Sequence, residues 1–169
     1  FREVCDRHSC KTVFYEVKRE NLHVYLDLGL SVLKLGEEAF VDLPTFSLDG
    51  ASRKNMRNIR NTLEKQGCYL EVVPSQNFSD IAGDLQMVSD EWLAAKNTRE
   101  KRFSLGRFDH AYLSNFPTAI IRREGKILAF ANIWQTWTKE ELSIDLMRFA
   151  SSAPGGVMEY LLCSLMLWG

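Results

Sequence analysis

The sequence predicts an α+β protein in which helices flank a mostly antiparallel sheet. From residue 52 onward, the expected elements run helix, strand, helix, three strands, loop and helix, an order typical of α+β folds. Two short turns, Glu124–Gly125 and residues 136–139, join consecutive strands as tight antiparallel hairpins. Hydrophobic residues form 46% of the 169-residue chain and charged residues 25%, so the composition is that of a globular protein.

The first part of the chain gives weaker signals than the rest. Residues 12–17 (TVFYEV) are rich in β-forming side chains and predict a strand. Gly29 is a natural end for the helix before it, and Pro44 stops the extended residues that precede it. The elements expected here are a helix end at residues 1–8, a strand at 12–17, a helix at 21–28 and one or two extended segments at 32–43.

From residue 52 the signals are stronger, because apolar residues recur at regular spacing. Residues 78–96 carry an apolar stripe at helical spacing, and Gly67 closes the helix before them. Residues 97–109 form a charged, irregular loop. The elements expected here are helices at 52–66, 78–96 and 157–168, a helical turn at 109–115, and strands at 69–73, 118–123, 126–135 and 140–149.

Charge and cysteine content exclude several classes of protein. The formal net charge is -1, so no polyanionic or polycationic partner is indicated for the chain as a whole. No apolar run reaches the ~18 residues that span a bilayer. The four cysteines form no CxxC pair and have no histidine at metal-ligand spacing, so we interpret them as small buried side chains in a reducing compartment. We expect no metal site and no cofactor.

The helix expected at residues 52–66 carries a concentrated positive charge. Arg53, Arg57 and Arg60 fall at positions i, i+4 and i+7 on one face, with Lys54 beside them. The helix has five basic residues and one acid, which gives 5 − 1 = +4. A solvated amphipathic helix is the simple alternative, but an arginine stripe with one acid nearby suits phosphate groups, so we favour phosphate binding that is sensitive to salt and independent of sequence.

Asp145 and Arg148 are candidate functional residues in the last expected strand. Strand alternation would place Leu142, Ile144 and Leu146 on one face and Asp145 on the other. A carboxylate in the middle of a buried sheet is costly without a partner, which favours a functional role over a structural ion pair. Residues i and i+3 point to opposite faces, so Asp145 and Arg148 would not meet unless a bulge intervenes.

The order of elements resembles the GCN5-related acetyltransferase (GNAT) architecture, the acyl-CoA N-acyltransferase-like fold. In that architecture the amides of a loop at a helix N-terminus bind an anion, and residues 151–156 followed by the helix 157–168 would be the matching unit. The loop reads SSAPGG, whereas the acetyl-CoA loop is a glycine-rich run with a leading Arg or Gln. Coenzyme A is therefore not the expected ligand.

Longer motifs carry a more specific resemblance. They are LDLGLSVLKLGEEAFVDL, the basic helix, EKRFSLGRFD and ELSIDLMRFASSAPGGVMEYL, in this order. They resemble the C-terminal cytosolic domain of the bacterial phosphatidylglycerol lysyltransferases and alanyltransferases, the multiple peptide resistance factor family, over most of the chain.

The resemblance implies two GNAT-like modules in tandem, of which this chain holds a piece. Residues 1–43 would be the C-terminal part of the first module, 44–66 a linker with the basic helix, and 67–169 the N-terminal part of the second. The family continues past Gly169, so we expect a fragment that is cut short at both ends and inactive alone. Residues 12–43 would supply strands that complete the sheet. A sheet edge left open would favour self-association, and the chain would then form a homo-oligomer.

The resemblance also implies the reaction. Lysine or alanine would move from tRNA to a glycerol hydroxyl of phosphatidylglycerol by transesterification, which gives a cationic lipid that repels antimicrobial peptides. The partners would be aminoacyl-tRNA, phosphatidylglycerol and the membrane surface, at the cytoplasmic face of the bacterial cell membrane.

Roles for single residues follow from the same resemblance. Asp145 would engage the amino group of the aminoacyl moiety or orient the lipid hydroxyl, and Arg148 would bind a phosphate or the ester carbonyl. Tyr112, in a segment expected to line a substrate tunnel, would lie near the active site. The tRNA acceptor end would contact the basic helix through Arg53, Lys54, Arg57 and Arg60. The alternatives are a GNAT acetyltransferase that uses acetyl-CoA and a non-catalytic module that binds RNA or a membrane.

Overall fold

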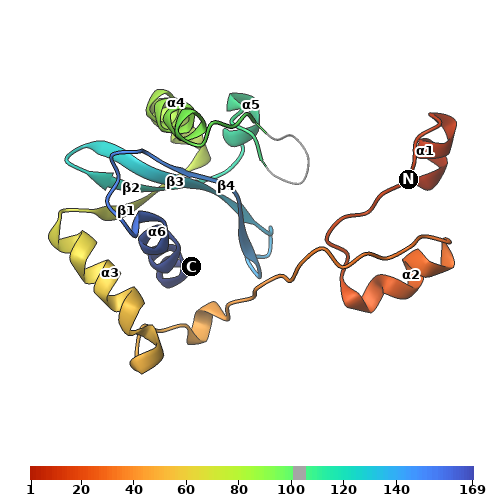
Figure 1. Cartoon of the computed structure of the whole chain (residues 1–169), viewed down its shortest axis with the longest axis horizontal. Helices are drawn as coiled ribbons and strands as arrows, with labels where there is room; N and C mark the ends of the chain where they lie inside the picture. Colours follow the sequence, from red (N-terminus) through yellow and green to blue (C-terminus); the bar gives the residue numbers. More distant parts are fainter. Residues whose placement is uncertain (101–105) are drawn as a thin grey trace. The chain divides into compact units, whose positions relative to one another are not determined.

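The computed structural model describes residues 1–100 and 106–169, and it confirms the α+β class. Contacts separate two compact units, Phe1–Phe40 and Val41–Gly169. The elements can be followed along the chain in Figure 1. Residues 101–105, which belong to the motif EKRFSLGRFD, lie outside the described ranges. Within those ranges no helix combines the length and the apolar character needed to cross a bilayer.

The unit Phe1–Phe40 consists of short helices and irregular chain. Its elements are α1 (Arg2–Arg7), the 3-10 turn η1 (Arg19–Asn21) and α2 (Leu22–Asp27). The helix expected at residues 21–28 is confirmed. Gly29 ends it with a φ of 74°, and the Gly29 N–H donates to the carbonyl of Leu26 at 2.8 Å. Phe14 packs against Tyr25 with ring centroids 4.9 Å apart, which ties the segment before η1 to α2.

The strand expected at residues 12–17 is wrong, and the extended residues 32–43 enter no sheet. Glu16 has a positive φ of 56°, which interrupts an extended run. A strand also needs a neighbour to pair its N–H and C=O groups, and the strands found in the described residues all lie between 69 and 149. The expected strands of residues 12–43 are therefore not found.

In the described part of the unit Val41–Gly169, four strands form an antiparallel sheet in the order β1-β2-β3-β4. Its elements are η2 (Leu43–Thr45), η3 (Ala51–Arg53), α3 (Lys54–Lys65), β1 (Tyr69–Val73), η4 (Ser75–Asn77), α4 (Phe78–Ala95), α5 (His110–Leu113), β2 (Thr118–Arg123), β3 (Lys126–Gln135), β4 (Leu142–Phe149) and α6 (Val157–Trp168). The first three strands and α6 have the expected bounds. β4 begins two residues late, because the hydroxyl of Thr136 accepts the N–H groups of Glu140 and Glu141 and holds them in the turn.

Helices cover both faces of this sheet, as Figure 1 shows. α4 and α5 lie over one, which we call the α4/α5 face, and α3 and α6 lie over the other, the α3/α6 face. Neighbouring residues of β2 alternate between them, since Ile120 packs with the α4 cluster and Ile121 with the α6 cluster. The α4/α5 core includes Phe78, Ile81, Leu85, Val88, Leu113, Ile120, Phe130 and Leu146. The α3/α6 core includes Leu63, Ile121, Leu128, Ala129, Ala131, Val157, Tyr160 and Leu161.

β4 contains a β-bulge in its pairing with β3. Ala131 pairs with Met147 and Ile133 pairs with Ile144, so an advance of two residues on β3 matches three on β4. The extra residue lies opposite Asn132. Beyond it, the side chains of β4 alternate between the two faces in the opposite order.

The bulge makes the expected alternation of β4 wrong. Ile144 packs on the α3/α6 face, but Leu146, two residues later, belongs to the α4/α5 core. Arg148 follows Leu146 onto the α4/α5 face, where Asp145 already lies. Two residues that a regular strand would separate are thus on the same side of the sheet.

α3 and α6 approach each other closely where α6 begins. Gly156 precedes α6 with a φ of 86°, and a Cβ at this position would lie 3.0 Å from Cγ2 of Ile59 on α3. The helix expected at residues 52–66 is confirmed as η3 followed by α3. Leu63 of α3 is 1% exposed and anchors the helix in the α3/α6 core.

Candidate active site

Asp145 lies at the centre of a polar cluster on the α4/α5 face. Its Oδ2 accepts a hydrogen bond from the hydroxyl of Tyr112 at 2.6 Å, and its Oδ1 accepts the N–H of Gly106 at 2.8 Å. A carboxylate has room for about four hydrogen bonds, and Asp145 accepts two from the described residues, so as far as these residues go it has capacity for further donors. The Gly106 contact is close, because a Cβ there would lie 2.0 Å from Oδ2 of Asp145. Only glycine fits at position 106 with the carboxylate in this place.

The Tyr112 hydroxyl is fully engaged within the protein. It donates to Asp145 and accepts from the indole N–H of Trp134 at 3.0 Å and from the amide of Asn132 at 3.4 Å. One donor and two acceptor sites are all that a phenol has. Burial, followed by the hydrogen bond and the negative charge of Asp145, raises the pKa of Tyr112 to about 12. Tyr112 is therefore a neutral hydrogen-bond donor at physiological pH.

Tyr112 is placed by the short helix α5. Asp109 caps that helix, accepting the N–H of Tyr112 at 3.1 Å, and forms an ion pair with Arg107 at 2.7 Å. The backbone hydrogen bond from Tyr112 and then the bond from Arg107 hold the pKa of Asp109 below its usual value. The ring of Tyr112 also packs edge-on against Phe116, with centroids 5.2 Å apart.

Arg148 forms a second buried cluster on the same face. Its guanidinium donates to the Ser89 hydroxyl at 2.6 Å and to the Glu100 carboxylate at 2.7 Å, and it lies 5.2 Å from the ring centroid of Trp92. Its side chain is 4% exposed. Ser89 and Trp92 are both on α4, so Arg148 connects the edge of the sheet to that helix.

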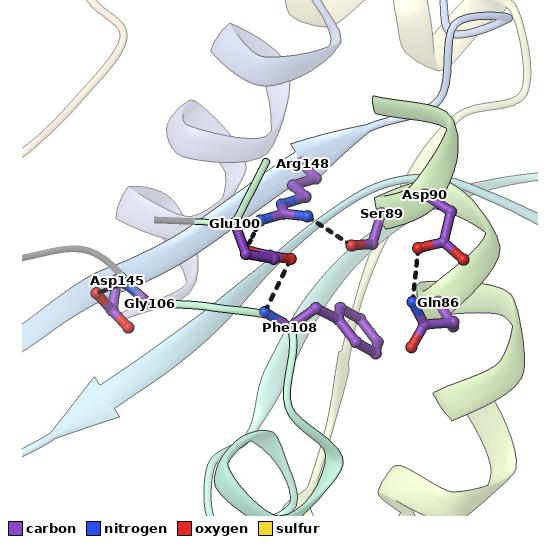
Figure 2. Close-up of polar contacts among 8 residues, drawn as sticks. All are labelled: Gln86, Ser89, Asp90, Glu100, Gly106, Phe108, Asp145 and Arg148. Atoms are coloured by element: carbon purple, nitrogen blue, oxygen red, sulfur yellow. Dashed lines mark hydrogen bonds and ion pairs between the residues drawn. The ribbon is translucent and has the colours of Figure 1, made fainter. Parts of the chain in front are cut away.

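The two clusters are linked through Glu100 and the segment 106–108, as Figure 2 shows. Glu100 accepts from Arg148 and also accepts the N–H of Phe108 at 3.3 Å. Gly106, on the same segment, donates to Asp145. The structure thus brings the predicted residues Tyr112 and Asp145 into direct contact. Arg148 does not bond to either within the described residues, and reaches them through this segment.

Several basic side chains of the basic helix bind groups of the protein itself. Arg57 donates to the carbonyl of Gly50 at 2.7 Å and to that of Leu48, and Arg60 pairs with Glu64 at 2.8 Å. Arg53 lies over the ring of Phe46 at 5.3 Å. Lys54 is exposed to solvent. The arginine side chains, which have one acidic neighbour in the sequence of the helix, are therefore partly bound to other groups of the protein in the structure.

Sequence reasoning missed the residues that support Asp145 and Arg148. Asn132 and Trp134 lie on β3, Ser89 on α4, and Glu100 follows α4. An asparagine between Ala131 and Ile133, in a run of otherwise apolar residues, was the available signal for Asn132. No periodicity marks Glu100 among the charges of its loop.

Comparison with known proteins gives consistent matches. The family model described as the C-terminal part of phosphatidylglycerol lysyltransferase matches residues 1–169. Phosphatidylglycerol lysyltransferase of Bacillus subtilis (strain 168) is 43% identical over 158 residues, which are 92% of this chain and 18% of that protein. The enzyme of the same name from Staphylococcus aureus (strain MRSA252) is 32% identical over 157 residues, again 92% and 18%. This chain therefore spans less than a fifth of the length of these relatives.

Two solved structures share the fold. A crystal structure of a C-terminal domain assigned to lysylphosphatidylglycerol synthetase from Agrobacterium fabrum has a TM-score of 0.89 and 44% identity, covering 98% of this chain and 52% of that chain. The structure of L-PGS from Bacillus licheniformis has a TM-score of 0.90 and 40% identity, covering 99% and 53%. These neighbours confirm the expected GNAT-like α+β fold.

Proposed function

Because this chain belongs to the family of phosphatidylglycerol lysyltransferase C-terminal domains, we propose that it forms part of the site that transfers lysine, or alanine, from tRNA to phosphatidylglycerol. The observation that carries the proposal is the Asp145 carboxylate, which is held by Tyr112 and Gly106 and still has room for donors. Donors of this kind are present on both substrates, as the ammonium of the aminoacyl group and the hydroxyl of the lipid.

The proposed reaction is a transesterification. A glycerol hydroxyl of the lipid attacks the ester carbonyl of aminoacyl-tRNA, forming a new carbon–oxygen bond. The bond from that carbon to the ribose oxygen breaks, and the proton of the lipid hydroxyl ends on the released ribose oxygen. The acyl group arrives activated, so the protein has to align two large substrates, transfer a proton and stabilise the oxyanion.

The contacts support different roles for the three predicted residues. Asp145 has hydrogen-bonding capacity that the described residues leave unused, and it would touch a substrate donor. Tyr112 and Arg148 are occupied by protein partners, which favours positioning roles for both. Direct contact of Arg148 with a phosphate or the ester carbonyl stays a prediction, and it would use guanidinium N–H groups other than those bonded to Ser89 and Glu100.

The proposal includes the partners and the place of action. Aminoacyl-tRNA would contact α3, with the exposed Lys54 and the partly engaged Arg53, Arg57 and Arg60 facing phosphates. Phosphatidylglycerol would be reached at the cytoplasmic surface of the cell membrane. The division into a first-module tail at 1–43, a basic linker at 44–66 and a second module at 67–169 also remains a proposal, and so does a homo-oligomer.

The test is a substitution in a full-length transferase that carries this sequence. Asp145→Asn keeps the shape but removes the charge, and we expect lysyl transfer from labelled lysyl-tRNA to phosphatidylglycerol vesicles to fall about 10²–10⁴-fold, the usual value of a positioned acid–base or charge partner. Asp27→Asn, an exposed aspartate on α2, is the matched control. Wild-type transfer by Asp145→Asn would disprove the assignment, and acetyl transfer from acetyl-CoA would favour the acetyltransferase alternative.

A second substrate separates the two roles open to Asp145. Lysyl-tRNA with both its α-amino and ε-amino groups acetylated offers no ammonium to the carboxylate. If Asp145 binds the ammonium, the wild-type enzyme should use this substrate as poorly as Asp145→Asn uses lysyl-tRNA. If Asp145 orients the lipid hydroxyl, the acetylated substrate should react at a rate close to normal in the wild type and remain sensitive to Asp145→Asn.

A further inference from the structure

We infer that Asn132 is a positioning residue that holds the bulge of β4, and thereby places Asp145 and Arg148 on one face of the sheet. The inference rests on the proposed function, because it assigns a purpose to the place of Asp145. Asn132 is 0% exposed and lies on β3 directly opposite the bulge. A buried amide is costly unless its donors and acceptors are paired, so its contacts show what it does.

All the hydrogen bonds seen for the Asn132 side chain go to the Asp145 cluster. Its Oδ1 accepts the backbone N–H of Leu146 at 2.7 Å and that of Asp145 at 3.3 Å. Its Nδ2 donates to the hydroxyl of Tyr112 at 3.4 Å, which in turn donates to the Asp145 carboxylate. A single side chain therefore contacts both the backbone of Asp145 and the residue that binds its carboxylate.

The backbone contacts explain why the bulge forms at this point. A bulge leaves one extra residue unpaired on its strand, and its N–H group still needs an acceptor. The Asn132 oxygen serves the N–H groups of both bulge residues. An apolar side chain of similar size would leave these donors without that acceptor, which favours a regular ladder.

A regular ladder would separate the two functional residues. If β4 paired with β3 without a bulge, Asp145 and Arg148 would fall on opposite faces, because they are three positions apart. Arg148 would then leave Ser89 and Glu100, and the link from Arg148 through Glu100 to Phe108 would be lost. The amide of Asn132 thus determines the geometry of the whole cluster.

The test is a double-mutant cycle on the full-length enzyme. Asn132→Leu replaces the amide with an apolar group of similar volume, and we expect kcat for lysyl transfer to fall at least tenfold with a smaller change in KM. In an Asp145→Asn background the same change should lower kcat by a smaller factor, because the position of residue 145 no longer matters and only that of Arg148 is lost. Ile133→Val is the matched control, a buried substitution at the next residue of β3 that packs with Leu165 of α6 on the other face.

Equal loss in both backgrounds would overturn the inference, since that is how a general structural defect behaves. Wild-type kcat in folded Asn132→Leu would overturn it too. If the leucine variant does not fold, Asn132→Asp is used, because it keeps the oxygen that accepts from Leu146. Its Leu146 amide should then stay protected from hydrogen exchange, and fast exchange there would contradict the inference. If Asp145→Asn proves active, the proposed function fails, while hydrogen exchange still tests whether Asn132 holds the bulge.

Discussion

The two faces of the sheet are packed with different kinds of side chain. The α3/α6 face packs Leu63, Ile121, Leu128 and Leu161 into an apolar core. The α4/α5 face has an apolar core of its own, but it also holds Ser89, Asn132 and Arg148, which are buried polar side chains. Thr118, the remaining buried polar residue among those described, is paired with Asn132 across β2 and β3 and so shares its face.

This contrast indicates that the α3/α6 face contributes mainly to stability and the α4/α5 face mainly to activity. An apolar core stabilises by burial and does not depend on the direction of its groups. A buried polar cluster adds little net stability, but it fixes directions, and it is costly when a partner is lost. We therefore expect substitutions on the α3/α6 face to change mainly the free energy of unfolding, and those on the α4/α5 face to change activity out of proportion to stability.

The largest loss of stability should follow Leu161→Ala on α6. Leu161 is 0% exposed, and its truncation leaves a cavity that costs about 3 kcal/mol in unfolding free energy. Urea unfolding followed by circular dichroism measures this loss. At temperatures where the variant is folded, kcat should match the wild type. A specific loss of kcat would break the distinction between the faces.

Arg148→Met should cost less stability and more activity. The substitution leaves Ser89 and Glu100 without their donor, but Glu100 is 25% exposed and can be partly hydrated, so we expect about 2 kcal/mol rather than the loss of a fully buried pair. Transfer activity should fall at least tenfold. Glu100→Gln retains a hydrogen-bond acceptor for Arg148 and should have a smaller effect on both quantities. Full activity in Arg148→Met would show that the cluster is merely structural.

Tyr112→Phe should cost about 1 kcal/mol, the usual value of a lost hydrogen bond. It also gives a dependence on pH. The pKa of Tyr112 rises from 10.0 to about 12 in the folded chain, so its contribution to stability is complete below pH 10 and is lost as the pH rises through 12. Tyrosinate absorbance in the folded protein should lose a late-titrating component in Tyr112→Phe. An unchanged titration curve would contradict the raised pKa of Tyr112.

The smallest effect on stability should come from Lys54→Gln, an exposed change that we expect to alter unfolding by less than about 0.5 kcal/mol. If α3 binds phosphates, affinity for tRNA should fall, and the dependence of log affinity on log salt should flatten by about one. Lys65→Gln, the same change at the other end of α3, is the control. Equal effects of the two would indicate attraction by net charge, without a specific binding position.

The sequence predicted the parts of the fold that depend on local patterns. β1, β2, β3 and α6 have periodic apolar residues and clear turn residues, and they were placed at their observed bounds. Residues 12–17 have the composition of a strand but no neighbouring strand, and composition does not supply a partner. Tyr112 and Asp145 were expected in one site through a family resemblance, and the structure brings them together.

The details of the site depended on information that is not local. Whether Arg148 shares a face with Asp145 depends on one extra residue in the ladder, which is fixed by the side chain of Asn132 on another strand. The partner of Arg148, Glu100, comes from a segment 48 residues away. Neither fact can be predicted from the spacing of residues within β4.

The two adjacent glycines before α6 should differ sharply in how much variation they tolerate. A side chain at Gly155 would meet nothing within 4 Å, whereas one at Gly156 would be strained by its φ of 86° and would press on Ile59. A saturation library of this loop should therefore accept many residues at 155 and almost none at 156. Since Ile59 is on the basic helix, any survivor at 156 would have displaced the very helix that we propose to meet tRNA.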